Sequence, residues 1–351
     1  IVAVIEGFGE AARLALSAGC DGVEINAGQH SLVRQFLSGL TNQRGDEYAD
    51  RLLFARQVVH AVKSAALAVN ADAVIGLRLS CDELAPWAGI TPEMAPEIAR
   101  ELCELGIDYV VVVRGSIFSV EKTRPDFHEP TGFNIDVCRS IRSALPAHVA
   151  VFLQGSIVEV GQAEWAMNDG VCDAVEMTRA QIADPDLVQK ISNDQHTQIR
   201  PCIRCNQTCQ VRDARNPIVT CVSEPTSGHE LQDPNWYTTS SSPRHITVVG
   251  AGVAGLETAR VAALRGHSVT IVEKSSSTGG IAAIAGPGQP LVAWLNSEID
   301  RLKVRVELGQ EFDGSSVSNS QVVVQATGAQ RGVTEYEIIS GAVVLDIADV
   351  R

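Results

Sequence analysis

Positive charge is scarce in this sequence. Its 28 Lys and Arg residues face 42 Asp and Glu residues, which gives a formal net charge of −14 and a pI near 5.0. No basic surface is therefore expected to neutralise phosphate groups, which argues against nucleic acid or an anionic membrane as a partner. No apolar run approaches the roughly 18 residues that a membrane-spanning helix needs. We expect a cytoplasmic protein that acts on a small-molecule substrate; homo-oligomerisation is compatible with the sequence but not specified by it.

The cysteine content does not indicate a disulfide framework. The sequence has nine cysteines, an odd number, and five of them lie scattered among apolar neighbours, where we expect core thiols: Cys20, Cys81, Cys103, Cys138 and Cys172. The other four fall within twenty residues: Cys202, Cys205, Cys209 and Cys221. Clustering of this kind is typical of a metal site in a reducing compartment.

The first 195 residues alternate between helix-period segments and short apolar runs. Helices are expected at 3–18, 51–65, 91–105, 134–144, 158–168 and 184–193, and strands at 22–26, 74–80, 109–113, 149–155 and 174–178. Such alternation predicts a parallel sheet with crossover helices. A complete (β/α)8 barrel has eight such units, so a barrel would lack its first three strands here. An open doubly wound sheet fits the alternation equally well. Because Ile1 falls inside an expected helix, we treat both ends of the chain as cut.

Residues 222–244 lose periodicity and predict an interdomain linker. A strand then leads into Gly250-x-Gly252-x-x-Gly255, and a second strand ends at Glu273. In this context the glycines permit a tight turn, close approach of a pyrophosphate and close packing of helix on strand, while the carboxylate accepts hydrogen bonds from a ribose. The motif predicts a dinucleotide site for FAD or NAD with a free 2′-hydroxyl. Gly280 and the segment 326–328 favour FAD, because they resemble parts of pyridine-nucleotide-disulfide-type flavoproteins.

The four clustered cysteines have the spacing C-x2-C-x3-C-x11-C. Short spacings on one loop let three thiolates surround one corner of a cluster while the distant fourth closes it. Zinc is the rival ligand, although zinc sites more often pair two Cys-x2-Cys hairpins. The asymmetry favours a [4Fe–4S] cluster.

Several stretches together resemble a known family, the Old Yellow Enzyme-like flavoproteins that carry an iron–sulfur cluster and an FAD domain, such as 2,4-dienoyl-CoA reductase and trimethylamine dehydrogenase. They are Asp21–Ile25, Gln35–Ser38, Thr41–Tyr48, Gly76–Ser80, Ala183–Leu187 and the cysteine run. The resemblance implies an α/β protein with part of a TIM-type (β/α)8 barrel at 1–195, a cluster segment and linker at 196–244, and an incomplete Rossmann-like FAD or NAD(P) domain at 245–351. The segment 26–31 and the short segment 47–51 further resemble members associated with the mycofactocin system.

The resemblance also implies FMN at the carboxyl end of the barrel. Arg78 would lie at the flavin N1/O2 edge and stabilise the negative charge of reduced flavin. Gly155 and Ser156 after one strand, with Thr178 and Arg179 after the next, would bind the FMN phosphate, where such barrels usually place it.

The sequence departs from the family pattern at the substrate. Two His or Asn residues three apart usually hold the substrate carbonyl and a Tyr delivers a proton, but here the matching residues are Asn26, Gln29 and Ser31. Asn26 and Gln29 can still donate hydrogen bonds to a carbonyl oxygen. Ser31 is too weak an acid, so His30 is the candidate proton donor, with an exposed loop histidine as the equally weighted alternative.

The resulting hypothesis is an oxidoreductase that passes electrons from NAD(P)H through FAD and [4Fe–4S] to FMN and an activated alkene. A first alternative is an amine dehydrogenase of the trimethylamine dehydrogenase type, for which an aromatic cage around the amine is expected. A second alternative is a truncated, catalytically incomplete fragment, which would bind FMN poorly because an open sheet edge replaces the missing strands.

Overall fold

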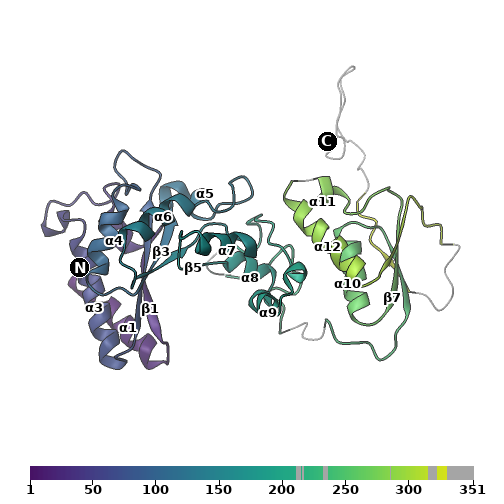
Figure 1. Cartoon of the computed structure of the whole chain (residues 1–351), viewed down its shortest axis with the longest axis horizontal. Coiled ribbons are helices and arrows are strands. Elements are labelled where there is room, and N and C mark those ends of the chain that lie inside the picture. The colour runs from purple at the N-terminus through teal and green to yellow at the C-terminus, as the bar shows by residue number, and fades with distance from the viewer. Residues whose placement is uncertain (211–214, 216, 232–235, 285, 315–321, 330–351) are drawn as a thin grey trace, which may run out of the picture. The chain divides into compact units, whose positions relative to one another are not determined.

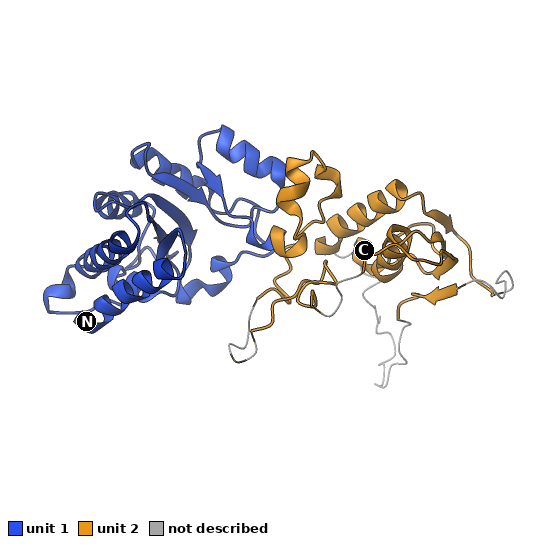
Figure 2. Ribbon diagram, turned by 90° about the horizontal axis from the view of Figure 1, so that it is seen from below, with its two compact units in different colours: residues 1–179 blue, residues 180–351 orange. Residues whose placement is uncertain are grey.

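The computed structural model describes residues 1–351 except 211–214, 216, 232–235, 285, 315–321 and 330–351 (Figure 1). The described residues form two units, Ile1–Arg179 and Ala180–Arg351 (Figure 2). Each unit is built on its own sheet, one of five strands and one of four, and all pairings in both sheets are parallel. This confirms the predicted α/β class.

The first sheet follows chain order. Its strands are β1 (Gly22–Ala27), β2 (Val74–Asp82), β3 (Tyr109–Arg114), β4 (Ala150–Leu153) and β5 (Ala174–Val175). All five lie at predicted positions, but the predicted runs 149–155 and 174–178 are too long. Only two residue pairs join β4 to β5, and Gly155 leaves the extended conformation with φ 128°, so hydrogen bonding ends early at this side of the sheet.

Helices connect the strands of this sheet. They are α1 (Val2–Ser17), α2 (Leu32–Leu37), α3 (Leu53–Val69), α4 (Ala95–Cys103), α5 (Val120–Thr123), α6 (Ile135–Ala144) and α7 (Val160–Asn168), with 3-10 turns η1 (Glu47–Ala49) and η2 (Ile117–Ser119). The short α2 and α5 were not predicted, because a helix of one or two turns leaves little periodic signal. Gly9 lets α1 approach α3 closely, since a Cβ there would lie 3.3 Å from the Ala61 carbonyl oxygen.

The first sheet packs against the helices, and one contact across it shows that it curves like a barrel wall. Alternate β2 and β3 residues such as Leu77, Leu79, Val110 and Val112 are fully buried in one core with the helices. On the sheet, Arg78 of β2 contacts Glu176, the residue after β5, although flat strands three positions apart would be about 14 Å from each other. The open doubly wound sheet is therefore excluded for this unit.

The second unit begins with α8 (Thr178–Ala183, whose first two residues belong to the first unit), α9 (Leu187–Ser192) and η3 (His196–Gln198). Its sheet has the order β8-β7-β6-β9, from β6 (His245–Val249), β7 (Ser268–Glu273), β8 (Arg305–Leu308) and β9 (Val322–Gln325). The helices α10 (Val253–Leu264), α11 (Ile281–Ile284) and α12 (Gln289–Arg301) and the turn η4 (Gly286–Gly288) complete it. The predicted strand 268–273 and the helix ending near 265 are confirmed.

A separate apolar cluster holds this unit together. Val248 of β6, Leu256 of α10, Ile271 of β7 and Leu295 of α12 are completely buried in it. None of the described helices is both long and apolar enough to cross a membrane.

Candidate functional site

Arg78 is held between carboxylates on the curved first sheet. Its Nε lies 2.7 Å from Glu24 Oε1 of β1, and its Nη2 lies 2.5 Å from Glu176 Oε1. The Tyr109 hydroxyl of β3 donates to Glu24 Oε2 at 3.2 Å. Burial alone would lower the pKa of Arg78, but the hydrogen bond and charge of Glu176, followed by Glu24, raise it overall. The guanidinium is a permanent, fixed cation.

The predicted phosphate residues meet where β4 and β5 end. Arg179 Nη2 donates to Ser156 Oγ at 2.7 Å, and both side chains also reach the Pro125 carbonyl oxygen, at 2.9 and 2.8 Å. Only glycine fits at 155, because its φ is 128° and a Cβ would lie 2.8 Å from the side chain of Asn134. Thr178 is exposed at the first residue of α8. The structure thus brings Gly155, Ser156 and Arg179 together, and Thr178 precedes Arg179 in sequence.

The loop after β1 carries the predicted substrate residues. Asn26 is exposed, and its Oδ1 accepts a hydrogen bond from the Gly28 amide at 2.9 Å. The Gln29 amide nitrogen donates instead to two carbonyl oxygens, that of Thr123 at the end of α5 at 3.0 Å and that of Arg114 at the end of β3 at 3.4 Å. Gln29 therefore anchors one loop to another in this structure, and it must give up these bonds to donate to a substrate.

His30 is exposed, next to Gln29 in the same loop. Partial burial, followed by the positive charges of Arg124 and Arg34, lowers the pKa of its imidazole below the usual 6.5. Ser31 has a different task, because its Oγ accepts a hydrogen bond from the Arg34 amide at 3.1 Å and caps α2.

The three glycines of the motif have the geometry predicted for them from the sequence: a tight turn, open space for a pyrophosphate, and close packing of helix on strand. Gly250 has φ 101°, and a Cβ there would lie 2.4 Å from the Ala326 carbonyl oxygen. A Cβ on Gly255 would lie 1.9 Å from the Gly250 carbonyl oxygen, so helix α10 cannot pack on β6 with any larger residue. Around Gly252 no atom lies within 4 Å of such a Cβ, which leaves open the space that a pyrophosphate would need.

Glu273 and Gly280 lie beside this motif. Glu273 Oε2 accepts a hydrogen bond from the Ala251 amide at 2.7 Å, and Oε1 accepts one from the Ser275 amide at 2.8 Å. Burial would raise the pKa of Glu273, but these backbone hydrogen bonds lower it overall. A Cβ on Gly280 would lie 3.6 Å from the Gly252 Cα. Gly252, Glu273 and Gly280 therefore surround one position.

The four clustered cysteines are partly buried. The Arg204 amide donates to Cys202 Sγ at 3.4 Å, and the Ser223 amide donates to Cys221 Sγ at 3.3 Å. Thr208 and Thr220 exchange hydrogen bonds and bring the residues beside Cys209 and Cys221 together. Among the residues that the structure describes, no group of three or more His, Cys, Asp or Glu is placed to hold a metal ion.

One expectation about the other cysteines is wrong. Cys81, Cys103, Cys138 and Cys172 are buried as predicted, but Cys20 is exposed. It lies in the turn between α1 and β1, where the flanking residues Ala18, Gly19 and Asp21 are exposed as well.

Three side chains of these sites were not predicted from the sequence: Glu24, Glu176 and Asn134. The two glutamates each stand in an apolar strand context, which was the available signal that a charged partner faces them. Asn134 is 2% exposed and no described group bonds to its Oδ1, yet nothing in its sequence neighbourhood distinguishes it from a surface residue.

Several proteins with known names or solved structures are similar to this chain. The chain is 36% identical over 82% of its length to a metal reductase of Desulforamulus reducens, and 34% identical over 93% to an N,N-dimethylglycine/sarcosine dehydrogenase of Chromohalobacter salexigens. Among solved structures, a 2-naphthoyl-CoA reductase complex matches 99% of the chain with a TM-score of 0.89 at 28% identity. The chain spans 43%, 49% and 54% of these proteins, respectively, so about half of each.

Two family profiles match successive parts of the chain. The profile of pyridine nucleotide-disulphide oxidoreductases matches residues 216–344, which include the glycine motif. The profile of the NADH:flavin oxidoreductase / NADH oxidase family matches residues 1–198, which include the curved sheet with Arg78 and Arg179. This chain belongs to the NADH:flavin oxidoreductase / NADH oxidase family.

Proposed function

We propose that the intact protein is a cytoplasmic reductase that uses NAD(P)H to reduce an alkene activated by a carbonyl or thioester group. When bound, FMN would supply hydride to the alkene, while FAD and a [4Fe–4S] cluster would supply the electrons taken from NAD(P)H. The similarity to a 2-naphthoyl-CoA reductase supports this class of substrate.

The contact between Arg179 and Ser156 behind Gly155 is the observation that carries the proposal. A guanidinium and a hydroxyl at the ends of adjacent barrel strands are the donors that a flavin phosphate requires, and glycine keeps the backbone clear. Their present bonds to the Pro125 carbonyl oxygen occupy donors that a phosphate would take. The residues fit FMN.

Three further side chains would act on the reacting groups. Arg78, kept charged by Glu24 and Glu176, would bind the pyrimidine edge of the flavin and stabilise negative charge there. Asn26 is an exposed residue, and its amide nitrogen would donate a hydrogen bond to the substrate carbonyl oxygen. His30 in its protonated form would donate a proton to the α-carbon.

The second unit also fits its proposed cofactors. The open space at Gly252 and the carboxylate of Glu273 suit the pyrophosphate and ribose of FAD. For the cluster, the support is the donor set: Cys202, Cys205, Cys209 and Cys221 supply four thiols, and two of them already accept backbone N–H groups, as cluster sulfurs do.

Cofactor analysis of the intact protein tests the proposal. We expect one FMN, one FAD and about four irons per chain, with both flavins bleached by NAD(P)H and FMN reoxidised by an α,β-unsaturated thioester without oxygen. An iron-free, zinc-loaded protein would exclude the proposed electron route through the cluster. Failure of an unsaturated thioester to reoxidise FMN would exclude an activated alkene as the substrate.

A second candidate is an amine dehydrogenase. The observation that favours it is the similarity to N,N-dimethylglycine/sarcosine dehydrogenase, which is named for N-methylated amine substrates. A cationic amine of this kind would be bound by aromatic rings around it. Anaerobic reduction of FMN by an N-methylated amine, with no reduction by NAD(P)H, would establish this candidate over the first.

A further inference from the structure

The two ends of the four-cysteine segment are joined by one buried side chain. Arg200 precedes Cys202 by two residues and is 3% exposed. Its Nη1 donates to the Ser223 carbonyl oxygen at 2.5 Å, and its Nε lies 2.9 Å from Glu224 Oε2. Ser223 and Glu224 lie two and three residues after Cys221, the last cysteine of the segment. Arg200 thereby closes the segment into a loop.

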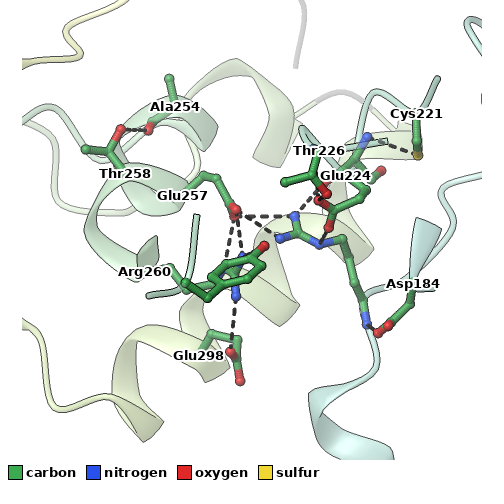
Figure 3. Close-up of polar contacts among 12 residues, drawn as sticks. Asp184, Cys221, Glu224, Thr226, Ala254, Glu257, Thr258, Arg260 and Glu298 are labelled. Carbon is green, nitrogen blue, oxygen red and sulfur yellow. Dashed lines mark hydrogen bonds and ion pairs between the residues drawn. The ribbon is translucent and has the colours of Figure 1, made fainter. Parts of the chain in front are cut away.

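The same guanidinium binds the dinucleotide domain. Its Nη2 lies 2.9 Å from Glu257 Oε1 of α10, and its Cζ lies 4.4 Å from the centre of the Trp294 ring of α12 (Figure 3 labels Glu257 and Glu224). Glu257 is the fifth residue after Gly252, on the helix that begins at the glycine motif. One side chain therefore connects the cysteine segment to the helix that would bind the pyrophosphate.

The charges around this contact are paired. Glu257 also binds Arg260, at 2.8 Å, and Arg260 lies 3.8 Å from Glu298 (Figure 3). Burial would raise the pKa of Glu257, but hydrogen bonding by Arg260 and the charge of Arg200 lower it overall. The backbone is held as well, because the Arg200 amide donates to buried Asp184 at 2.7 Å. A buried ion pair is weak evidence for stability, but removing one partner leaves an unpaired buried charge and is strongly unfavourable.

From these contacts we propose that Arg200 and Glu257 are positioning residues that hold both ends of the cysteine segment on α10, and so fix the cluster relative to the dinucleotide. The inference rests on the proposed role of the four cysteines as cluster ligands. Neither residue is a ligand, and neither touches the reacting atoms. Their effect is to keep the thiols in one arrangement and to slow the opening of the segment.

Iron retention in the intact holoenzyme is the first test. We expect Arg200→Gln and Glu257→Gln to lose cluster absorbance to a chelator about 10-fold faster than wild type or more, as for other groups that orient metal ligands. The electron paramagnetic resonance signal of the reduced cluster should broaden in both, and Arg200→Lys should recover part of the loss. Arg305→Gln is the matched control, since Arg305 is 74% exposed in a surface pair on the same unit. Equal FAD content in all variants verifies folding.

Amide exchange of the metal-free protein is the second test, and it separates the two proposals. Residues 200–204 and 220–224 should exchange faster in Arg200→Gln and Glu257→Gln but not in Arg305→Gln. If wild type holds no iron while this difference persists, the cluster is wrong and the positioning role stands. Exchange and iron loss within twofold of wild type in both variants would overturn the positioning role.

Discussion

At the scale of single residues, the lowered pKa of His30 bears directly on its proposed role as proton donor. Its lowered pKa means that the imidazole is mostly neutral at pH 7, whereas proton donation requires the protonated form. Alkene reduction should therefore speed up as pH falls and should decline as pH rises through a pKa below 6.5.

Replacement of His30 tests this directly. His30→Gln should leave reduction of FMN by NAD(P)H intact, slow alkene reduction by about 10²-fold, the usual worth of a general acid, and abolish the decline in rate with rising pH. Ser31→Ala should leave the chemistry unchanged but cost about 1 kcal/mol of stability, because Ser31 caps α2. Stopped-flow kinetics and thermal unfolding measure both. Normal turnover by His30→Gln would instead assign the proton to water or another residue.

Two glycines of one motif should respond differently to the same substitution. Gly255→Ala places a methyl group 1.9 Å from the Gly250 carbonyl oxygen and should destabilise the second unit by about 1–3 kcal/mol. Gly252→Ala meets no atom and has φ −71°, so stability should change by less than about 1 kcal/mol while FAD affinity falls. Thermal unfolding and FAD titration distinguish them. Unchanged FAD binding in Gly252→Ala would show that no pyrophosphate approaches there.

At the scale of secondary-structure elements, Arg78 of β2 links its own strand to the end of β5, which is three strands away in the sheet. Because its ion pairs link β2 to β1 and to the end of β5, Arg78→Leu should cost about 1.5–3 kcal/mol, the range for hydrogen bonds to charged groups. It leaves two carboxylates unpaired. Adding Glu24→Gln and Glu176→Gln should recover part of this loss, and denaturant unfolding of the single, double and triple variants measures the coupling. Strictly additive effects would mean that the ion pairs contribute nothing to the free energy of unfolding.

At the scale of the whole molecule, the described residues contain two apolar clusters that share no residue. Unfolding should then proceed in two transitions instead of one. Leu77→Ala and Leu295→Ala remove equally buried leucines, one from each cluster, and each should cost about 2–5 kcal/mol. Calorimetry of the intact protein should show that each substitution moves a different transition. If either substitution shifts both transitions together, the two units unfold cooperatively.

The sequence by itself determined the local elements of this protein. Alternating apolar runs placed all five strands of the first sheet, because burial on both faces of a parallel strand leaves a continuous apolar pattern. The glycine spacing of 250–255 predicted its turn and helix, since Gly255 lies against the Gly250 carbonyl oxygen within the same β–α unit. Family resemblance added Gly155, Ser156 and Arg179, which the structure brings together.

Only the tertiary structure decided which distant groups meet. The Gln29 amide nitrogen donates to the carbonyl oxygen of Thr123, 94 residues away, and Arg78 pairs with Glu176 across the curved sheet. Arg200 forms a hydrogen bond with Glu257, which lies 57 residues later in the chain, on helix α10. These partners depend on strand register and on how helices pack, and both are set by the summed burial of many side chains. No short stretch of sequence contains that information, so periodicity and spacing could predict the elements but not these contacts.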